Sequence, residues 1–193
     1  MTVSDRIRVH DVRLLSDNHY TLKTTTFEWR RANGEWQTQR RETYDRGNGA
    51  VLLPYNLAQR SVVLVKQFRY PAYVNGYDGL MIEAAAGLLD NASPEARIRA
   101  EAEEETGYRL GEITKVFEAF MSPGSVTEKL HFFVAEYEAK MRVGAGGGIE
   151  AEGEEIEVLE LAIDAALAMI ADGRIVDAKT IMLLQHAALN IFR

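Results

Sequence analysis

Apolar positions along the chain predict an N-terminal hairpin and then a buried sheet. Residues 20–45 alternate in the manner of strands and are interrupted at Asn33-Gly34, a dipeptide that favours a tight turn. Two runs dense in Val and Leu, residues 50–55 and 61–68, follow a glycine-rich break. Continuous apolar runs of this length are typical of strands buried on both faces. A central sheet is therefore expected to begin near residue 50.

One helix is marked by signals at both of its ends. Residues 81–89 are apolar around a single charge, Glu83, and precede a short polar loop. Ser93 then stands where an N-cap belongs, Pro94 at the first helical position and Gly107 at the C-terminal cap. These signals predict a helix over residues 94–106.

The second half of the chain predicts more strands and then two helices. Residues 113–121 and 126–138 have a strand pattern around a Ser-Pro-Gly turn, and residues 156–161 form a shorter apolar run. Residues 164–171 and 177–191 carry Leu, Ile and Met at spacings of three and four, which indicates amphipathic helices.

Residues 144–148 are almost entirely glycine, which predicts a mobile segment. It leads into an acidic run of Glu150, Glu152, Glu154, Glu155 and Glu157. The segment is interpreted as a mobile acidic loop.

Composition narrows the class of protein. The chain has 193 residues, 47% of them hydrophobic, which is enough for one main domain with a small additional module. A formal net charge of -7 argues against nucleic acid as a partner, because such binders need positive charge against the phosphates. An acidic protein that handles phosphates needs metal cations or a few placed Arg and Lys side chains.

Cysteine is absent, which excludes disulfides, thiolate nucleophiles and Cys-ligated zinc. The N-terminus has no apolar signal core, and no stretch approaches the roughly 20 apolar residues that cross a bilayer. We therefore expect a cytoplasmic protein with no membrane partner.

The predicted helix carries a cluster of carboxylates. Glu101, Glu104 and Glu105 share one helical face, because residues three and four apart are neighbours. Carboxylates at this spacing repel one another unless a cation neutralises them, and Mg²⁺ or Mn²⁺ suits hard oxygen ligands. The alternative is a solvated acidic face, which is common on protein surfaces. The apolar run and the capped loop before the helix favour a ligand site.

Residues 87–108 resemble the Nudix box, a glycine followed by a helix with the pattern Arg-Glu-apolar-x-Glu-Glu-x-Gly-apolar. Two positions differ: Ala100 replaces the arginine and Ser93 replaces the earlier glutamate. The interval from Gly87 to Glu101 is also one residue shorter. Arg97 or Arg99 could replace the missing ion pair, and Glu95 the missing carboxylate.

The resemblance covers nearly the whole chain. It extends to Arg46-Gly47-Asn48-Gly49-Ala50, Lys66-Gln67-Phe68-Arg69, Ser122-Pro123-Gly124 and Gly146-Gly147-Gly148-Ile149-Glu150. It is similar to the branch of Nudix hydrolases that cleaves GDP-mannose, with enzymes that cleave ADP-ribose as near relatives.

This resemblance implies a metal-dependent active site. The metal ligands would be Glu101, Glu105, the backbone carbonyl of Ala86 and Glu154 from the late loop. Glu104 and Glu105 are also expected to take part in catalysis. Glu152 would position or deprotonate the attacking water, with Glu154 and Glu155 as rivals.

Substrate contacts are implied at six further positions. Arg69 is the candidate diphosphate clamp, because a guanidinium can bind two phosphate oxygens at once. The others are His19, Arg41, Glu42, Glu128 and Lys179.

The expected fold is an α/β Nudix fold, an α/β/α sandwich with a mixed sheet in residues 47–193, preceded by a small antiparallel β module in residues 1–46. The resemblance implies a homodimer formed largely by that module. It also implies hydrolysis of GDP-mannose to GMP and mannose 1-phosphate, or of ADP-ribose to AMP and ribose 5-phosphate. A Nudix-fold module that binds without catalysis is the alternative, since a fold does not guarantee chemistry.

Overall fold

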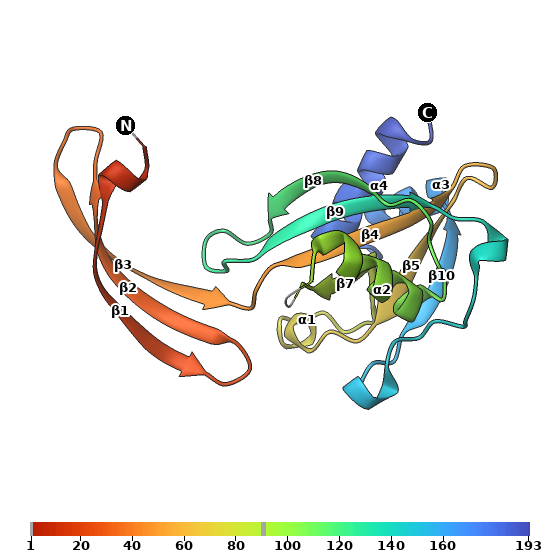
Figure 1. The fold of residues 1–193 in the computed structure, drawn as a ribbon, viewed down its shortest axis with the longest axis horizontal. Helices are drawn as coiled ribbons and strands as arrows, with labels where there is room; N and C mark the ends of the chain where they lie inside the picture. The colour runs from red at the N-terminus through yellow and green to blue at the C-terminus, as the bar shows by residue number, and fades with distance from the viewer. Residues whose placement is uncertain (1, 90–91) are drawn as a thin grey trace. The chain divides into compact units, whose positions relative to one another are not determined.

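The computed structural model describes residues 2–89 and 92–193, apart from the side chain of Glu152. The chain forms two compact units (Figure 1). The first comprises residues 1–48 with residues 120–129, and the second comprises residues 49–119 with residues 130–193.

The first unit is a three-stranded antiparallel sheet in the order β1-β2-β3. Its elements are η1 (Ser4–Arg6), β1 (Ile7–Asp17), β2 (Thr21–Arg30) and β3 (Trp36–Asp45). Strands β2 and β3 are the hairpin that the sequence predicts, with Asn33-Gly34 in the turn. Strand β1 extends that hairpin, and its pairing with β2 shifts register twice, between Val9 and Asp11 and between Leu14 and Ser16.

Residues 120–129 join this unit by backbone hydrogen bonds. The Tyr44 amide donates to the carbonyl of Ser125 at 2.8 Å, and the Thr127 amide donates to the carbonyl of Tyr44 at 3.1 Å. The predicted strand over residues 126–138 therefore begins as a strand only at Lys129.

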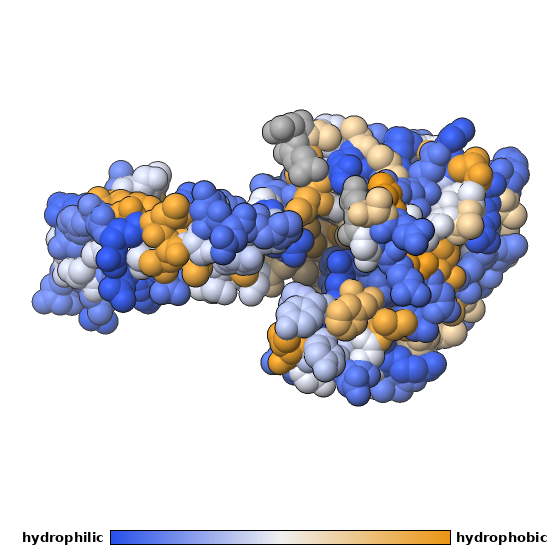
Figure 2. All heavy atoms as spheres, turned by 90° about the horizontal axis from the view of Figure 1, so that it is seen from below, coloured by the Kyte–Doolittle hydropathy of each residue, from blue (hydrophilic) through white to orange (hydrophobic). Residues whose placement is uncertain are grey.

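The sheet of the first unit buries very little. Among its strands only Thr24 is buried, whereas several apolar residues of β1 are exposed. These are Ile7, Val9, Val12, Leu14 and Leu15. Figure 2 shows apolar, orange side chains on the surface of this sheet. A small sheet is stable mainly when other atoms cover its apolar face, so the exposed apolar side chains of β1 suggest a surface that binds a partner.

The second unit is built on a mixed seven-stranded sheet. Its main path runs β10-β5-β4-β9-β8, with β6 paired to β5 and β7 paired to β4. The strands are β4 (Gly49–Asn56), β5 (Ser61–Gln67), β6 (Met81–Glu83), β7 (Ala85–Leu88), β8 (Thr114–Phe120), β9 (Lys129–Glu136) and β10 (Glu157–Ala162). Strands β4 and β9 are parallel, whereas β5 is antiparallel to β10, β4 and β6.

Helices cover both faces of this sheet, which confirms the predicted α/β/α sandwich. Helix α2 (Pro94–Thr106) packs on one face, where Ile98 and Ala102 join Ala50 and Leu52 of β4 in a buried cluster. Successive strand residues point to opposite faces, so Val51 lies on the other side of β4. There α3 (Ile163–Ala171) and α4 (Ala178–Asn190) pack against the sheet.

Three short helical segments complete the second unit: α1 (Tyr70–Val74), η2 (Ala139–Met141) and η3 (Glu150–Glu152). No helix within the described ranges is both long and apolar enough to cross a membrane.

Candidate active site

Helix α2 has both of the caps that the sequence predicts. The hydroxyl of Ser93 accepts a hydrogen bond from the Ala96 amide at 3.3 Å, and Gly107 ends the helix in the left-handed region with φ of 76°. These caps set the first and last turns of the helix, and therefore the faces on which its glutamates lie.

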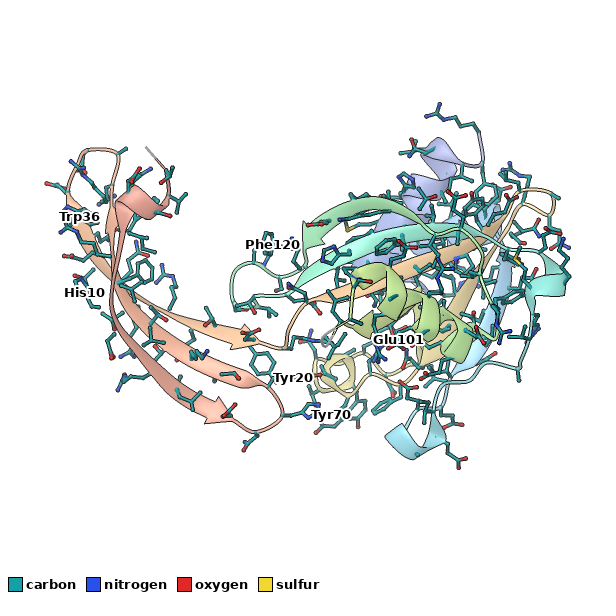
Figure 3. The ribbon with its side chains drawn as sticks, in the orientation of Figure 1. His10, Tyr20, Trp36, Tyr70, Glu101 and Phe120 are labelled. Atoms are coloured by element: carbon teal, nitrogen blue, oxygen red, sulfur yellow. The ribbon has the colours of Figure 1, made fainter. Side chains whose placement is uncertain are left out.

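Glu101 is pressed against Gly87 of strand β7. A Cβ atom on residue 87 would lie 2.2 Å from Oε1 of Glu101, so only glycine leaves room for this carboxylate. The side chain of Glu101 is buried and pairs with Arg97 one turn earlier, at 2.5 Å. Figure 3 labels Glu101 on α2.

Glu105 lies one turn further along and is also buried. Its Oε2 accepts a hydrogen bond from the backbone amide of Ala86 at 3.2 Å. Burial and the neighbouring Glu101 carboxylate raise the pKa of Glu105 to about 8. A cation bound beside these two buried carboxylates would offset the repulsion that Glu101 exerts on ionised Glu105.

Arg97 makes the ion pair to Glu101 that the arginine of the Nudix box would make, since Ala100 stands at that position here. It binds Glu101 and donates from Nε to the carbonyl of Leu88 at 3.1 Å, so it links α2 to the end of β7. Arg99 instead pairs with exposed Glu95 at 3.1 Å and also binds the carbonyl of Leu110. Of the two alternatives left open by the sequence, the ion pair to the box glutamate is therefore made by Arg97.

The glycine-rich segment is bound to the C-terminal end of α2. The Gly147 amide donates to the carbonyl of Glu105 at 2.9 Å, and the Gly148 amide donates to the carbonyl of Glu104 at 3.3 Å. A Cβ atom on Gly146 would lie 2.5 Å from that same Glu105 carbonyl oxygen. The sequence predicts a mobile segment here, whereas in the structure its backbone caps the helix that carries the box glutamates.

Glu154 follows the glycine-rich segment, six residues after Gly148. Its Oε2 accepts a hydrogen bond from the Ile149 amide at 2.9 Å, and a Cβ atom on Gly148 would lie 2.4 Å from the same oxygen. Its charge still raises the pKa of Glu105. Within residues 2–89 and 92–193, no three His, Asp or Glu side chains are arranged to hold a metal ion. The predicted set of Glu101, Glu105 and Glu154 is therefore brought to one region without being gathered at ligand distance.

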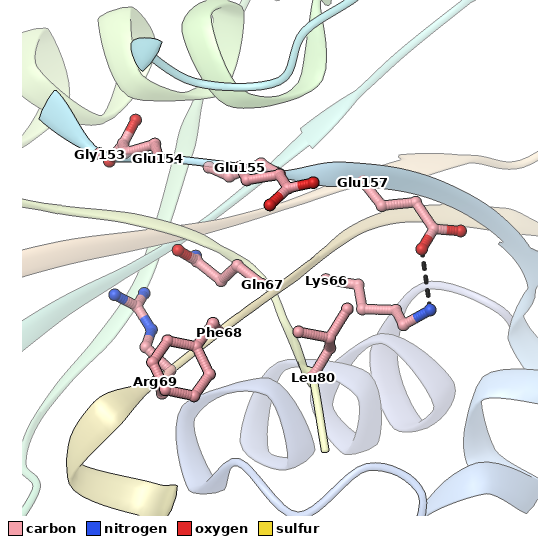
Figure 4. Close-up of a pocket in the computed structure, with 10 residues that line it drawn as sticks. Lys66, Gln67, Phe68, Arg69, Leu80, Gly153, Glu154, Glu155 and Glu157 are labelled. Carbon is pink, nitrogen blue, oxygen red and sulfur yellow. Dashed lines mark hydrogen bonds and ion pairs between the residues drawn. The ribbon is translucent and has the colours of Figure 1, made fainter. Parts of the chain in front are cut away.

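A pocket of about 620 Å³ adjoins these loops (Figure 4). Residues 66–69, Leu80 and residues 153–157 line it. Glu155 is exposed at the pocket, and the guanidinium of Arg69 points toward the segment that carries Glu154 and Glu155. The predicted base Glu152 belongs to η3, but its side chain lies outside the described residues. Glu104 is half-buried on α2.

Two predicted substrate contacts, Arg69 and Lys179, meet at one buried carboxylate, Glu83, for which the sequence predicted no role. Arg69 Nε lies 2.7 Å from Oε2 of Glu83, and Lys179 Nζ lies 2.6 Å from Oε1 of the same residue. The available signal was that Glu83 is the only charge in the apolar run of residues 81–89.

The remaining predicted substrate contacts lie in the first unit. His19, Arg41 and Glu42 are exposed, and the His19 ring stacks at a tilt on Tyr20 with ring centroids 4.4 Å apart. Glu128 pairs with Arg46 at 3.4 Å. The structure does not test whether these four residues contact the substrate, so their roles stay predictions.

The structure thus has the arrangement of the Nudix hydrolases. Helix α2 of an α/β/α sandwich carries two buried glutamates, Arg97 supports one of them, and Gly87 of the neighbouring strand makes room for it. Residues 6–44 match the family model described as the GDP-mannose pyrophosphatase NudK N-terminal domain. Relatives that are 52% to 54% identical along at least 95% of the chain show that it belongs to the GDP-mannose pyrophosphatase family of Nudix hydrolases.

Relatives match along almost the entire chain. A GDP-mannose pyrophosphatase from Pectobacterium atrosepticum is 54% identical over 189 residues, which cover 97% of both chains. One from Salmonella typhimurium is 52% identical, covering 95% of this chain and 96% of its own. One from Klebsiella pneumoniae is 53% identical, covering 95% of this chain and 92% of its own.

Proposed function

We propose that the chain hydrolyses GDP-mannose to GMP and mannose 1-phosphate in the cytoplasm, with Mg²⁺ or Mn²⁺ as cofactor. The observation that carries this proposal is the pair of buried carboxylates, Glu101 and Glu105, held against Gly87 and the Ala86 amide. Relatives with 52% to 54% identity that are named GDP-mannose pyrophosphatases support the choice of substrate.

The donor set suits a hard divalent cation. Glu101, Glu105 and the carbonyl of Ala86 would hold it, and Glu154 would join them by exchanging its bond to the Ile149 amide for the metal. When bound, such a cation neutralises diphosphate oxygens and lowers the pKa of a coordinated water. The space left by Gly87 allows the Glu101 carboxylate to lie against β7, one residue from the Ala86 carbonyl.

The chain's own residues bind the substrate and move the proton. Arg97 orients Glu101 through their ion pair, and Arg69 presents donors to the diphosphate. Glu152 accepts the proton of the attacking water, with Glu154 and Glu155 as rival bases. Glu152→Gln and Glu155→Gln, compared by kcat, distinguish these two candidates, because of the two only the variant that lacks the base should lose kcat by orders of magnitude. If both variants keep kcat, Glu154 is the base.

The first unit forms a homodimer in this proposal. Exposed Val12 and Leu14 lie on one face of β1, where a second copy would cover them. His19, Arg41 and Glu42 would then contact the nucleotide in the partner's site. Light scattering of Val12→Glu/Leu14→Glu is expected to give a monomer, and a dimer of unchanged stability would contradict this role.

The substrate is tested by incubating the protein with GDP-mannose or ADP-ribose, each with and without Mg²⁺, and separating the products by anion exchange. Metal-dependent release of GMP is expected, with little AMP from ADP-ribose. Glu101→Gln should abolish turnover, whereas Glu103→Gln, which breaks only an exposed pair with Arg109, should keep it. Binding of GDP-mannose without turnover would instead favour the non-catalytic module.

A further inference from the structure

Glu83 is a buried carboxylate shared by two cations. Its side chain is only 4% exposed, and each of its oxygens is bound by a different positive group, Arg69 Nε at 2.7 Å and Lys179 Nζ at 2.6 Å. Burying an ionised carboxylate is unfavourable unless it is paired and hydrogen-bonded. The side chain therefore requires both partners, and it holds each of them in place.

Lys179 is fixed by a second carboxylate as well. Asp177 lies 2.9 Å from Lys179 Nζ and caps α4 by accepting from the Thr180 amide at 3.0 Å. The hydroxyl of Thr180 in turn accepts a hydrogen bond from the Ala84 amide at 2.7 Å. The start of α4 is thus tied to the chain directly after Glu83, two residues before Ala86.

Arg69 is bound to Glu83 through only one of its three nitrogens. Its side chain is 41% exposed, and within the described part of the chain its two terminal nitrogens make no hydrogen bond. They point into the pocket of Figure 4. Arg69 is also close enough to Glu105 for its charge to act on that carboxylate. An untethered guanidinium at this position would be drawn onto the glutamates of α2.

Building on the proposed function, we propose that Glu83 is a positioning residue for diphosphate recognition. It holds Arg69 through Nε, which keeps the two terminal nitrogens available for phosphate oxygens and prevents Arg69 from neutralising the glutamates of α2. The planar guanidinium suits this division, because Nε and the terminal nitrogens donate along different edges.

The test is Glu83→Gln in the full-length protein. Glutamine keeps the shape but offers one acceptor and one NH₂ group, so it cannot accept from both Arg69 and Lys179. We expect the KM for GDP-mannose at saturating Mg²⁺ and the Kd for GDP, measured by calorimetry, each to rise by about tenfold or more, with kcat changed less. The Arg69→Lys variant should show a similar loss, and the double variant should be no worse than Arg69→Lys alone.

Controls separate positioning from folding and from the choice of substrate. Glu83→Asp retains the charge but is one methylene too short to reach both cations, so it should show the same loss of GDP affinity even if Glu83→Gln fails to fold. Glu103→Gln should change neither constant. An unchanged KM and GDP affinity in folded Glu83 variants, or fully additive effects with Arg69→Lys, would overturn the proposal. If the wild type binds GDP but does not cleave GDP-mannose, the proposed function fails while the GDP measurements still decide the role of Glu83.

Discussion

The amide of Gly147 donates a hydrogen bond to the carbonyl of Glu105 at 2.9 Å. Residues 146–148 thereby cap the helix that carries two predicted metal ligands, and the chain reaches a third, Glu154, six residues after Gly148. Gly146, Gly147 and Gly148 all have positive φ, a conformation that side chains disfavour. The position of Glu154 relative to Glu105 therefore depends on these glycines.

Gly146→Ala tests that dependence. The added Cβ would lie 2.5 Å from the Glu105 carbonyl oxygen, so the segment must move away from α2. We expect the apparent Kd for Mn²⁺, measured by calorimetry, to rise about tenfold or more, since changes to groups that position metal ligands typically lower metal affinity by about 10- to 100-fold. Gly173→Ala has the same left-handed strain with nothing within 4 Å, so it is the matched control. Equal Mn²⁺ affinity in the two variants would contradict this role.

Gly87→Ala should remove activity without altering the charge of the site. Its Cβ would lie 2.2 Å from Oε1 of Glu101, which forces the carboxylate away from β7. We expect kcat to fall by about 100-fold or more and the melting temperature to fall modestly. Gly111→Ala adds the same methyl group in open space and should retain full kcat. Near-normal turnover in Gly87→Ala would show that the position of Glu101 is not critical.

Metal binding should strengthen with pH up to about 8. Burial, and then Glu101, raise the pKa of Glu105 to about 8 in the metal-free protein, so a proton occupies this carboxylate at lower pH. The cation must displace that proton, and its apparent affinity should rise by up to tenfold per pH unit between 6 and 8 and then level off. Calorimetric titration with Mg²⁺ measures this, and Glu105→Gln should remove most of the dependence.

The raised pKa of Glu105 also affects the stability of the metal-free protein. A carboxyl group whose pKa is raised on folding binds its proton more tightly in the folded state, so its contribution is present at low pH and is lost as the pH rises from about 4.5 to 8. The melting temperature of the metal-free protein should therefore be lower at pH 8 than at pH 6, and this decrease should be larger than the one measured for Glu105→Gln. The increase in melting temperature caused by Mg²⁺ should be larger at pH 8. An equal increase at both pH values would contradict the assignment.

Arg97→Met should destabilise the metal-free protein more than the metal-bound one. Arg97 binds buried Glu101 at 2.5 Å, and losing a hydrogen bond to a charged group destabilises by about 2 kcal/mol. Since a bound cation would also neutralise Glu101, saturating Mn²⁺ should recover part of the loss, as thermal melts can show. Arg99→Met, which removes an ion pair with Glu95 and hydrogen bonds to the carbonyls of Leu110 and Gly111, is the comparison. An equal metal-dependent recovery in that variant would contradict the special role of Arg97.

Much of the local structure follows from sequence signals. Ser93, Pro94 and Gly107 place both ends of α2, because capping depends on hydrogen bonds and backbone angles within a few residues. The dense apolar runs that became β4 and β5 identify buried strands, since continuous burial leaves little room for polar side chains. The grouping of Glu101 and Glu105 follows from helical periodicity alone.

Contacts between distant segments were decided only by the tertiary structure. The Arg97–Glu101 pair is within one helix and follows from the spacing of four residues, but the hydrogen bond from Arg97 to the Leu88 carbonyl of β7 depends on how α2 packs against the sheet. Glycines 146–148 look flexible in sequence, yet folding brings them onto helix carbonyls about forty residues earlier in the chain. Local sequence determines propensity and spacing, but the partner of a buried charge such as Glu83 depends on which elements the core packs together, and its cations come from positions 14 residues before it and 96 residues after it.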